Sequence, residues 1–138
     1  MENSTLMTET IHLKLPAIAE NTLPVRLLVA GLANLHQFNS EEIEDMKLAV
    51  SEACAFTHEG SHWLDLAVHV DSDKLAIDIQ SEAVLQKPMI AHDDAALSGI
   101  GFELMKKLVD SMEYKSEGKS TFIRLTKYSK KNTKAKTA

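Results

Sequence analysis

The sequence predicts an α+β fold, a two-layer sandwich in which a mixed, mainly antiparallel sheet carries helices on one face. Two patterns support this class. In several short segments apolar residues alternate with polar ones, which is the period of a half-buried strand. Elsewhere they recur every three or four positions, as in a helix with one buried side. The expected order is β, α, α, β, β, loop, α, β, β, which favours helices packed on an antiparallel sheet.

The first strand is expected over residues 10–15, and Pro16 closes it. A first amphipathic helix is expected from Asn21, as its N-cap, to near Phe38. Ser40 is expected to cap a second helix, because acidic residues follow it and suit the positive end of a helix dipole. The core stripe of this second helix is formed by Ile43, Met46, Val50 and Cys54.

Residues 64–70 and 75–79 both alternate and are joined by a turn at 71–73, which predicts an antiparallel hairpin. Residues 81–98 show no clear period and contain Pro88, so we expect a long loop or lid there. Loops of that length in small domains often carry function.

A third helix is expected to begin near Gly99 to Gly101, since apolar residues follow at four-residue spacing. A strand at 113–116, a turn at 117–119 and a strand at 120–127 complete the expected fold. A chain of 138 residues suits one domain, expected at 10–128.

The two ends of the chain are expected to lie outside this domain. Residues 1–9 are predicted to be a flexible N-terminus, and residues 129–138 a basic, disordered tail. The net charge is −5, and five lysines lie from Lys127 onward, so the rest of the chain is more acidic still. An acidic body repels phosphate backbones, so no nucleic-acid partner is expected.

The sequence also predicts the compartment. No apolar run approaches the roughly 20 residues that a membrane helix needs, and the first residues lack the pattern of a secretory signal. The only cysteine, Cys54, has no partner for an internal disulfide. We therefore expect a cytoplasmic protein without a membrane partner.

Glu52 is the first candidate for chemistry. On a helical wheel it lies opposite the core stripe of the second helix, with Leu48 four residues before it and Phe56 four residues after it. A carboxylate between apolar side chains can line a pocket, or it can be a partly exposed surface acid. The pattern leaves both interpretations open.

The glycines of LSGIGFELMKKL are the second candidate site. Gly99 and Gly101 stand where a loop turns into a helix, so backbone N–H groups there can approach a phosphate. Glycine at such a junction is also common for backbone conformation alone.

His58 to His62 read as HExxH, the zinc-protease motif. The motif needs a continuous helix, whereas Gly60 falls inside it and a strand is expected to begin at about Trp63. We read Gly60 as the C-terminal cap of the second helix, and a zinc peptidase as a remote alternative. Cys54 lies on the core stripe, where a catalytic thiol is not expected.

These residues together resemble a known family. IHLKLP, KLAVSEAC and SGIGFELMKKL are similar to segments of the serine-kinase-type anti-sigma factors, which belong to the histidine-kinase-like ATPase superfamily. The resemblance covers roughly residues 10 to 128. It implies a fold with helices on one face of the sheet, an ATP site with magnesium, and regulation by partner switching.

The resemblance implies a role for each candidate position. Glu52 matches the glutamate that polarises the attacking hydroxyl, and Phe56 stands where the family has its magnesium-binding asparagine. Ser81 and Ala83 stand in place of the aspartate and glycine of the adenine-reading DxG pattern, and Gly99 and Gly101 match the last glycine box. Phenylalanine cannot coordinate a cation, so phosphoryl transfer is expected to be weakened or lost.

The resemblance also implies the partners. They are a sigma factor, a STAS-domain anti-sigma antagonist, or both, with Arg26 of the first helix in the partner site and a homodimer through the sheet. The leading hypothesis is a regulator that acts by binding such a partner. The alternative is an active ATP-dependent protein serine kinase that phosphorylates the antagonist, with Glu52 as its base.

Overall fold

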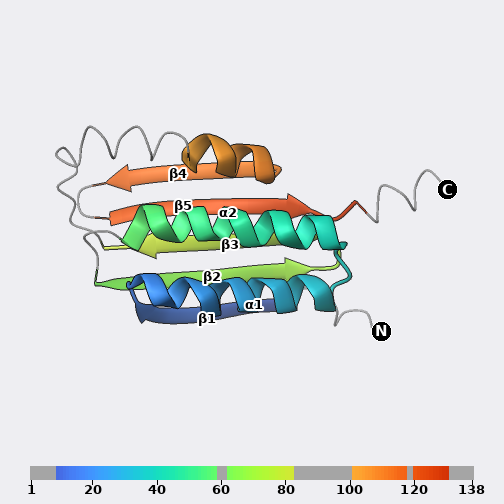
Figure 1. Cartoon of the computed structure of the whole chain (residues 1–138), viewed down its shortest axis with the longest axis horizontal. Helices are drawn as coiled ribbons and strands as arrows, with labels where there is room; N and C mark the ends of the chain where they lie inside the picture. The colour runs from blue at the N-terminus through green and yellow to red at the C-terminus, as the bar shows by residue number, and fades with distance from the viewer. Residues whose placement is uncertain (1–8, 59–61, 83–100, 118–119, 131–138) are drawn as a thin grey trace.

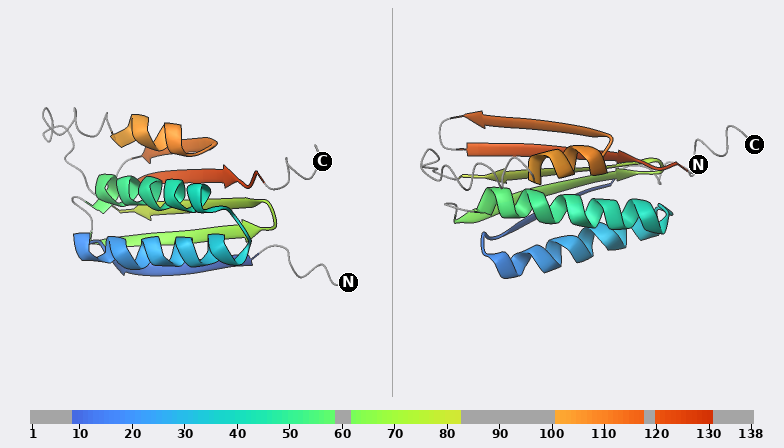
Figure 2. Two further views of the ribbon diagram at one scale, coloured as in Figure 1. Left: turned by 45° about the vertical axis from the view of Figure 1, so that its right-hand side comes forward. Right: turned by 45° about the horizontal axis from the view of Figure 1, so that its top comes forward.

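The computed structural model describes residues 9–58, 62–82, 101–117 and 120–130. Five strands form one sheet in the order β1-β2-β3-β5-β4, and helices cover one of its faces (Figures 1 and 2). The elements are β1 (Glu9–Pro16), a 3-10 turn (Ala19–Asn21), α1 (Thr22–Leu35), α2 (Ser40–His58), β2 (Trp63–Asp71), β3 (Lys74–Ser81), β4 (Ser111–Glu117) and β5 (Ser120–Tyr128). Residues 101–108 are also helical.

The predicted α+β class is confirmed. All four strand pairs are antiparallel, so the sheet of the described residues contains none of the parallel pairs that a mixed sheet would have. Within those residues, no helix is both long enough and apolar enough to cross a bilayer. The predicted loop at 81–98 lies outside the described residues from 83 onward, and so does the predicted cap Gly60.

The first helix ends earlier than predicted, at Leu35 instead of near Phe38. Gln37 adopts a left-handed conformation with a φ of 65°. Its N–H donates to the carbonyl of Asn34 at 3.0 Å, and the Phe38 N–H donates to the carbonyl of Ala33 at 3.0 Å. This pair of bonds is the Schellman motif, which closes a helix and usually has glycine at the left-handed position.

The second helix is capped by Asn39, and the prediction of Ser40 as the cap was wrong. Asn39 Oδ1 accepts a hydrogen bond from the Glu42 N–H at 2.8 Å, and Glu42 Oε1 accepts one from the Asn39 N–H at 2.8 Å. Such a reciprocal capping box satisfies two helix-end donors at once. Ser40 cannot form it because the acidic partner must stand three residues after the cap.

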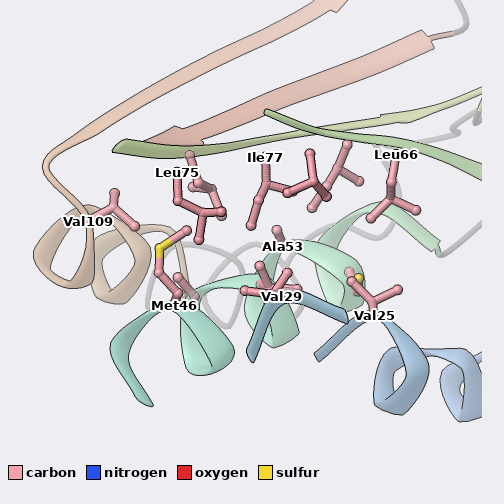
Figure 3. Packing of buried hydrophobic residues seen from close by; sticks show 14 of the residues in the cluster. Val25, Val29, Met46, Ala53, Leu66, Leu75, Ile77 and Val109 are labelled. Carbon is pink, nitrogen blue, oxygen red and sulfur yellow. The ribbon is translucent and has the colours of Figure 1, made fainter. Parts of the chain in front are cut away.

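The core lies between the helical layer and the sheet (Figure 3). The predicted stripe of α2 is fully buried at Met46, Val50 and Cys54, and Ile43 packs at its margin. Burial raises the pKa of the Cys54 thiol to about 12. The reactive thiolate is therefore absent at neutral pH, as expected for a core cysteine.

A polar network crosses the sheet face that no described helix covers. Arg124 on β5 binds Asp78 on β3 through two hydrogen bonds, and His69 on β2 lies 3.1 Å from the same carboxylate and 3.3 Å from the Thr10 hydroxyl. Burial alone would raise the pKa of Asp78, but the hydrogen bonds from Arg124 and His69 outweigh it and hold that pKa below its usual value. Self-association through this face stays a prediction.

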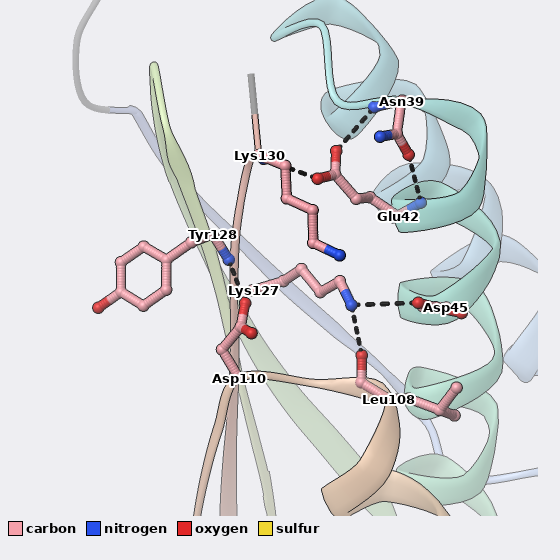
Figure 4. Close-up of polar contacts among 8 residues, drawn as sticks. All are labelled: Asn39, Glu42, Asp45, Leu108, Asp110, Lys127, Tyr128 and Lys130. Atoms are coloured by element: carbon pink, nitrogen blue, oxygen red, sulfur yellow. Dashed lines mark hydrogen bonds and ion pairs between the residues drawn. The ribbon is translucent and has the colours of Figure 1, made fainter. Parts of the chain in front are cut away.

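A second polar network fixes the end of β5 against α2 (Figure 4). Lys127 is 6% exposed, and its Nζ donates to Asp45 Oδ2 at 3.1 Å and to the Leu108 carbonyl at 2.7 Å. The Lys130 N–H donates to Glu42 Oε2 at 2.7 Å. The chain therefore stays bound to the domain through residue 130, the last residue that the structure describes.

Candidate functional site

Four of the predicted site residues come from elements that meet toward one end of the molecule. The C-terminal half of α2, the end of β3, the start of β5 and the start of helical residues 101–108 all lie toward that end (Figure 1). The structure brings Glu52 close to Gly101 and Phe56 close to Phe102, and Ser81 ends β3 toward the same end of the molecule. Ala83 and Gly99 lie outside the described residues.

Glu52 approaches the start of helical residues 101–108. A Cβ atom built on Gly101 would lie 2.8 Å from Glu52 Oε1, closer than real Cβ contacts come. Glycine at position 101 therefore makes room for the carboxylate. Within the described part of the chain, the half-buried Glu52 forms no hydrogen bond or ion pair, so its oxygens remain available to a bound group.

Phe56 belongs to an aromatic cluster. Its ring centroid lies 5.5 Å from that of Phe102 and 5.8 Å from that of Tyr114, and the Phe102 and Tyr114 centroids are 5.2 Å apart. These are tilted and edge-to-face contacts, which attract aromatic rings beyond simple burial. The cluster joins α2, helical residues 101–108 and β4. It places an aromatic ring at the position where the resembled family has its magnesium ligand.

Position 56 does not fit a magnesium ligand. Magnesium requires hard oxygen ligands in octahedral geometry, and Phe56 offers none. No group of three His, Cys, Asp or Glu side chains with metal-binding geometry occurs among the residues that the structure describes. The two histidines of the HExxH pattern do not share a helix, since α2 ends at His58 and His62 lies between α2 and β2.

The nucleoside end of a nucleotide fits better. Ser81 is fully buried at the end of β3, and its Oγ has no hydrogen-bond partner among the described residues. Thr121 on β5 pairs with Ser81 across the sheet and is also buried. Sequence reasoning missed Thr121, because no local signal reveals which residue of a distant strand faces Ser81.

Arg26 lies on α1, and no hydrogen bond, ion pair or ring contact among the described residues joins it to Glu52, Phe56 or Gly101. Its Nε is buried and has no hydrogen-bond partner among the described residues. Leu23 and Leu27 flank it on the same helix and are 54% and 60% exposed. Arginine is enriched among the residues that dominate protein–protein binding, and neighbouring exposed apolar side chains add contact area.

Comparisons with known proteins identify the family. A family model of the histidine kinase-like ATPase domain matches residues 15–127. The serine-protein kinase RsbW of Halalkalibacterium halodurans is 28% identical over 139 residues, which cover 87% of this chain and 83% of that protein. RsbW of Bacillus velezensis is 29% identical over 136 residues, which cover 86% of this chain and 84% of that protein.

A solved structure supports the fold independently. The RsbU and RsbW domains of a Mycobacterium tuberculosis protein align with a TM-score of 0.66 over 88% of this chain, at 13% identity. The aligned part is 33% of that longer chain. At this identity the likeness shows a shared fold and nothing further.

Proposed function

The chain belongs to the histidine kinase-like ATPase domain family, and from this premise we propose that it regulates by binding a partner protein, as an anti-sigma factor does, without transferring phosphate. The predicted resemblance to serine-kinase-type relatives in this superfamily is confirmed by the family match and by the RsbW relatives. The loss of phosphoryl transfer and the choice of partner are our proposals.

The aromatic cluster around Phe56 is the observation that carries the proposal. Phosphoryl transfer builds negative charge on the phosphate oxygens, and magnesium normally neutralises it. The position expected to hold magnesium instead packs against Phe102 and Tyr114. A water-filled metal site cannot form there without breaking these ring contacts.

The outer face of α1 is the proposed docking surface. Leu23 and Leu27 supply exposed apolar area, and Ile18, just before the helix, is 49% exposed. The Arg26 guanidinium can form two parallel hydrogen bonds to one carboxylate, a strong and directional contact. We therefore expect the partner, a sigma factor or a STAS-domain antagonist, to offer a carboxylate bordered by apolar side chains.

A second candidate, the active serine kinase, is favoured by Glu52. Its carboxylate is half-buried, close to Gly101 and free of other partners among the described residues, as a base that accepts a proton from a serine hydroxyl must be. ATP would supply the transferred phosphate. The kinase hypothesis then requires that residues outside the described part of the chain bind the cation.

Titration calorimetry with purified sigma-factor and STAS-domain proteins from the source organism tests the docking surface. Arg26→Ala should weaken binding at least about tenfold, and Arg26→Lys should also weaken it, since lysine cannot form the paired bonds. Lys107→Ala, an exposed basic residue on helical residues 101–108, is the matched control and should leave binding unchanged.

Radiolabelled ATP with magnesium tests the second half of the proposal. We expect no label on either partner under conditions in which the complex forms. Label that appears on a STAS-domain partner and disappears in Glu52→Ala would establish the kinase instead. Equal affinities of the parent chain, Arg26→Ala and the Lys107→Ala control would remove α1 as the docking surface.

A further inference from the structure

Gly31 lies within α1 at a position where the fold does not require glycine. A Cβ atom built on Gly31 would meet no atom within 4 Å, whereas one built on Gly101 would meet Glu52. The φ angle of Gly31 is not in the left-handed region either. Glycine inside a helix is less stable than alanine, because it loses more backbone freedom on folding. A destabilising glycine that the packing of the chain does not need indicates a close contact with another molecule.

Two exposed leucines flank this glycine. Leu27 and Leu35 lie four residues before and after Gly31, so the three positions follow one another along one side of α1. Leu27 is 60% exposed and Leu35 is 67% exposed, which are the two largest values among the exposed large hydrophobic side chains of the described residues. The C-terminal half of α1 therefore presents a notch between two apolar side chains.

The notch has the size of a crossing α-helix. Eight residues separate Leu27 from Leu35, which is about 12 Å along the helix axis, and an α-helix with its side chains is about 10–12 Å across. The side chains at the crossing point set the distance between two packed helices, so glycine there permits a close approach. A single extended strand is narrower, since neighbouring strands lie only about 4.8 Å apart, and it could not contact both leucines.

The charge of α1 describes the partner further. Arg26 is the only charged residue between Thr22 and Leu35, in a chain whose net charge is −5. Its Nε is buried and has no hydrogen-bond partner among the described residues. Arg26 precedes Gly31 by five residues, which is about 7.5 Å along the helix axis. A carboxylate at about that distance from the crossing point would pair with the guanidinium.

We infer that the partner lays an amphipathic α-helix across α1 at Gly31, with a small residue at the crossing point, apolar residues against the two leucines, and a carboxylate that reaches Arg26. The inference rests on the proposed function and extends the docking surface to Leu35. Gly31 is then a specificity-determining residue, because any larger side chain keeps the two helices apart.

Gly31→Ala tests the inference, because stability and binding should change in opposite directions. Alanine favours the helix and its methyl group meets open space, so the melting temperature should rise by about 2–3 °C. The same methyl group lies at the closest point of the crossing. Calorimetric titration with the sigma-factor or STAS-domain protein should therefore show about fivefold weaker binding, and Gly31→Leu should weaken it at least about tenfold.

Lys107→Leu is the matched control for bulk. Lys107 is exposed on helical residues 101–108, across the molecule from α1 (Figure 1), so the same leucine there should leave binding unchanged. Leu35→Ala adds no bulk but removes one apolar contact, and it should weaken binding about fivefold. Hydrogen exchange on the partner in the complex should show one protected segment whose apolar residues recur every three or four positions.

The unfavourable results are distinguishable from one another. Binding that Arg26→Ala weakens and Gly31→Leu leaves unchanged overturns the crossing helix but retains the docking surface. No binding to either protein overturns the proposed function and this inference with it. A protected partner segment with the alternating period of a strand also overturns the inference. So does a parent chain that light scattering shows to be a dimer and that Gly31→Leu converts to a monomer, because a second copy then covers α1.

Discussion

Replacing Lys127 with methionine removes a buried charge from the junction of β5 and α2. The Lys127 side chain is 8% exposed, and its Nζ binds both Asp45 and the Leu108 carbonyl (Figure 4). Leu108 is the last residue of helical residues 101–108, so its carbonyl has no partner within that helix. Methionine fills a similar volume but donates no hydrogen bond, so the change isolates the polar contacts from the packing.

The expected loss of stability follows from the two bonds. A hydrogen bond with a charged partner contributes about 1.5–3 kcal/mol. The Asp45 side chain is 30% exposed, so water recovers part of its bond, and the methionine retains the apolar packing. We therefore expect a net loss of about 2–3 kcal/mol, less than the ~3–5 kcal/mol of a fully buried pair that loses one member. At ~2.1 cal/mol/K for each of 138 residues, the melting temperature should fall by about 7–10 °C.

Calorimetric melts at neutral pH measure this difference. Lys130→Met is the control, because Lys130 is exposed and its contact to Glu42 is made by the backbone N–H. It should leave the melting temperature within about 2 °C of the parent value. A Lys127→Met variant that melts within the same margin, or above the parent, would refute the reasoning, since apolar packing would then replace the ion pair without loss.

Two further predictions concern Asp78 and Gly101. Burial alone would raise the pKa of Asp78, but the Arg124 bonds hold it below the unfolded value of about 3.8. The ionised carboxylate therefore stabilises the fold above that pH, and the contribution is lost as the pH falls through the folded pKa. The melting difference between the parent and Asp78→Asn should be constant above about pH 5 and shrink below about pH 4; a difference unchanged at about pH 3 would contradict this. Gly101→Ala should raise the melting temperature more in a Glu52→Ala background than in the parent, because the added Cβ meets Glu52 Oε1. Equal shifts in a thermal-melt cycle of the four proteins would show that the two positions do not interact.

The elements of the fold could be predicted because periodicity is local. The alternation of 64–70 and 75–79 and the stripe of α2 are visible in a few consecutive residues. Their ends were less predictable. The end of α1 depends on a left-handed Gln37, where the sequence offers no glycine. The start of α2 was hard to predict because Asn39 and Ser40 are adjacent and both residue types form caps, and only the bonds between Asn39 and Glu42 show which one does.

The candidate site could be predicted only in part, for the same physical reason. The spacing of Leu48, Glu52 and Phe56 placed the glutamate on a distinct face of α2, and the structure brings that face to Gly101. The ring partners of Phe56 and the strand partner of Ser81 come from distant segments. Tertiary packing and sheet register decide these contacts, and neither can be seen in local periodicity.

The strand order also constrains the sequence of events by which the chain folds. β2 and β3 follow one another in the sequence and pair antiparallel, as do β4 and β5, so each hairpin can form alone. Joining the hairpins requires pairs such as Ser81 with Thr121, across a long stretch of chain whose closure costs entropy before any contact compensates for it. α2 packs on β3 and on β5 and so bridges both hairpins. We therefore expect the docking of α2 to limit the folding rate, and β3 to pair with β5 once both pack against that helix.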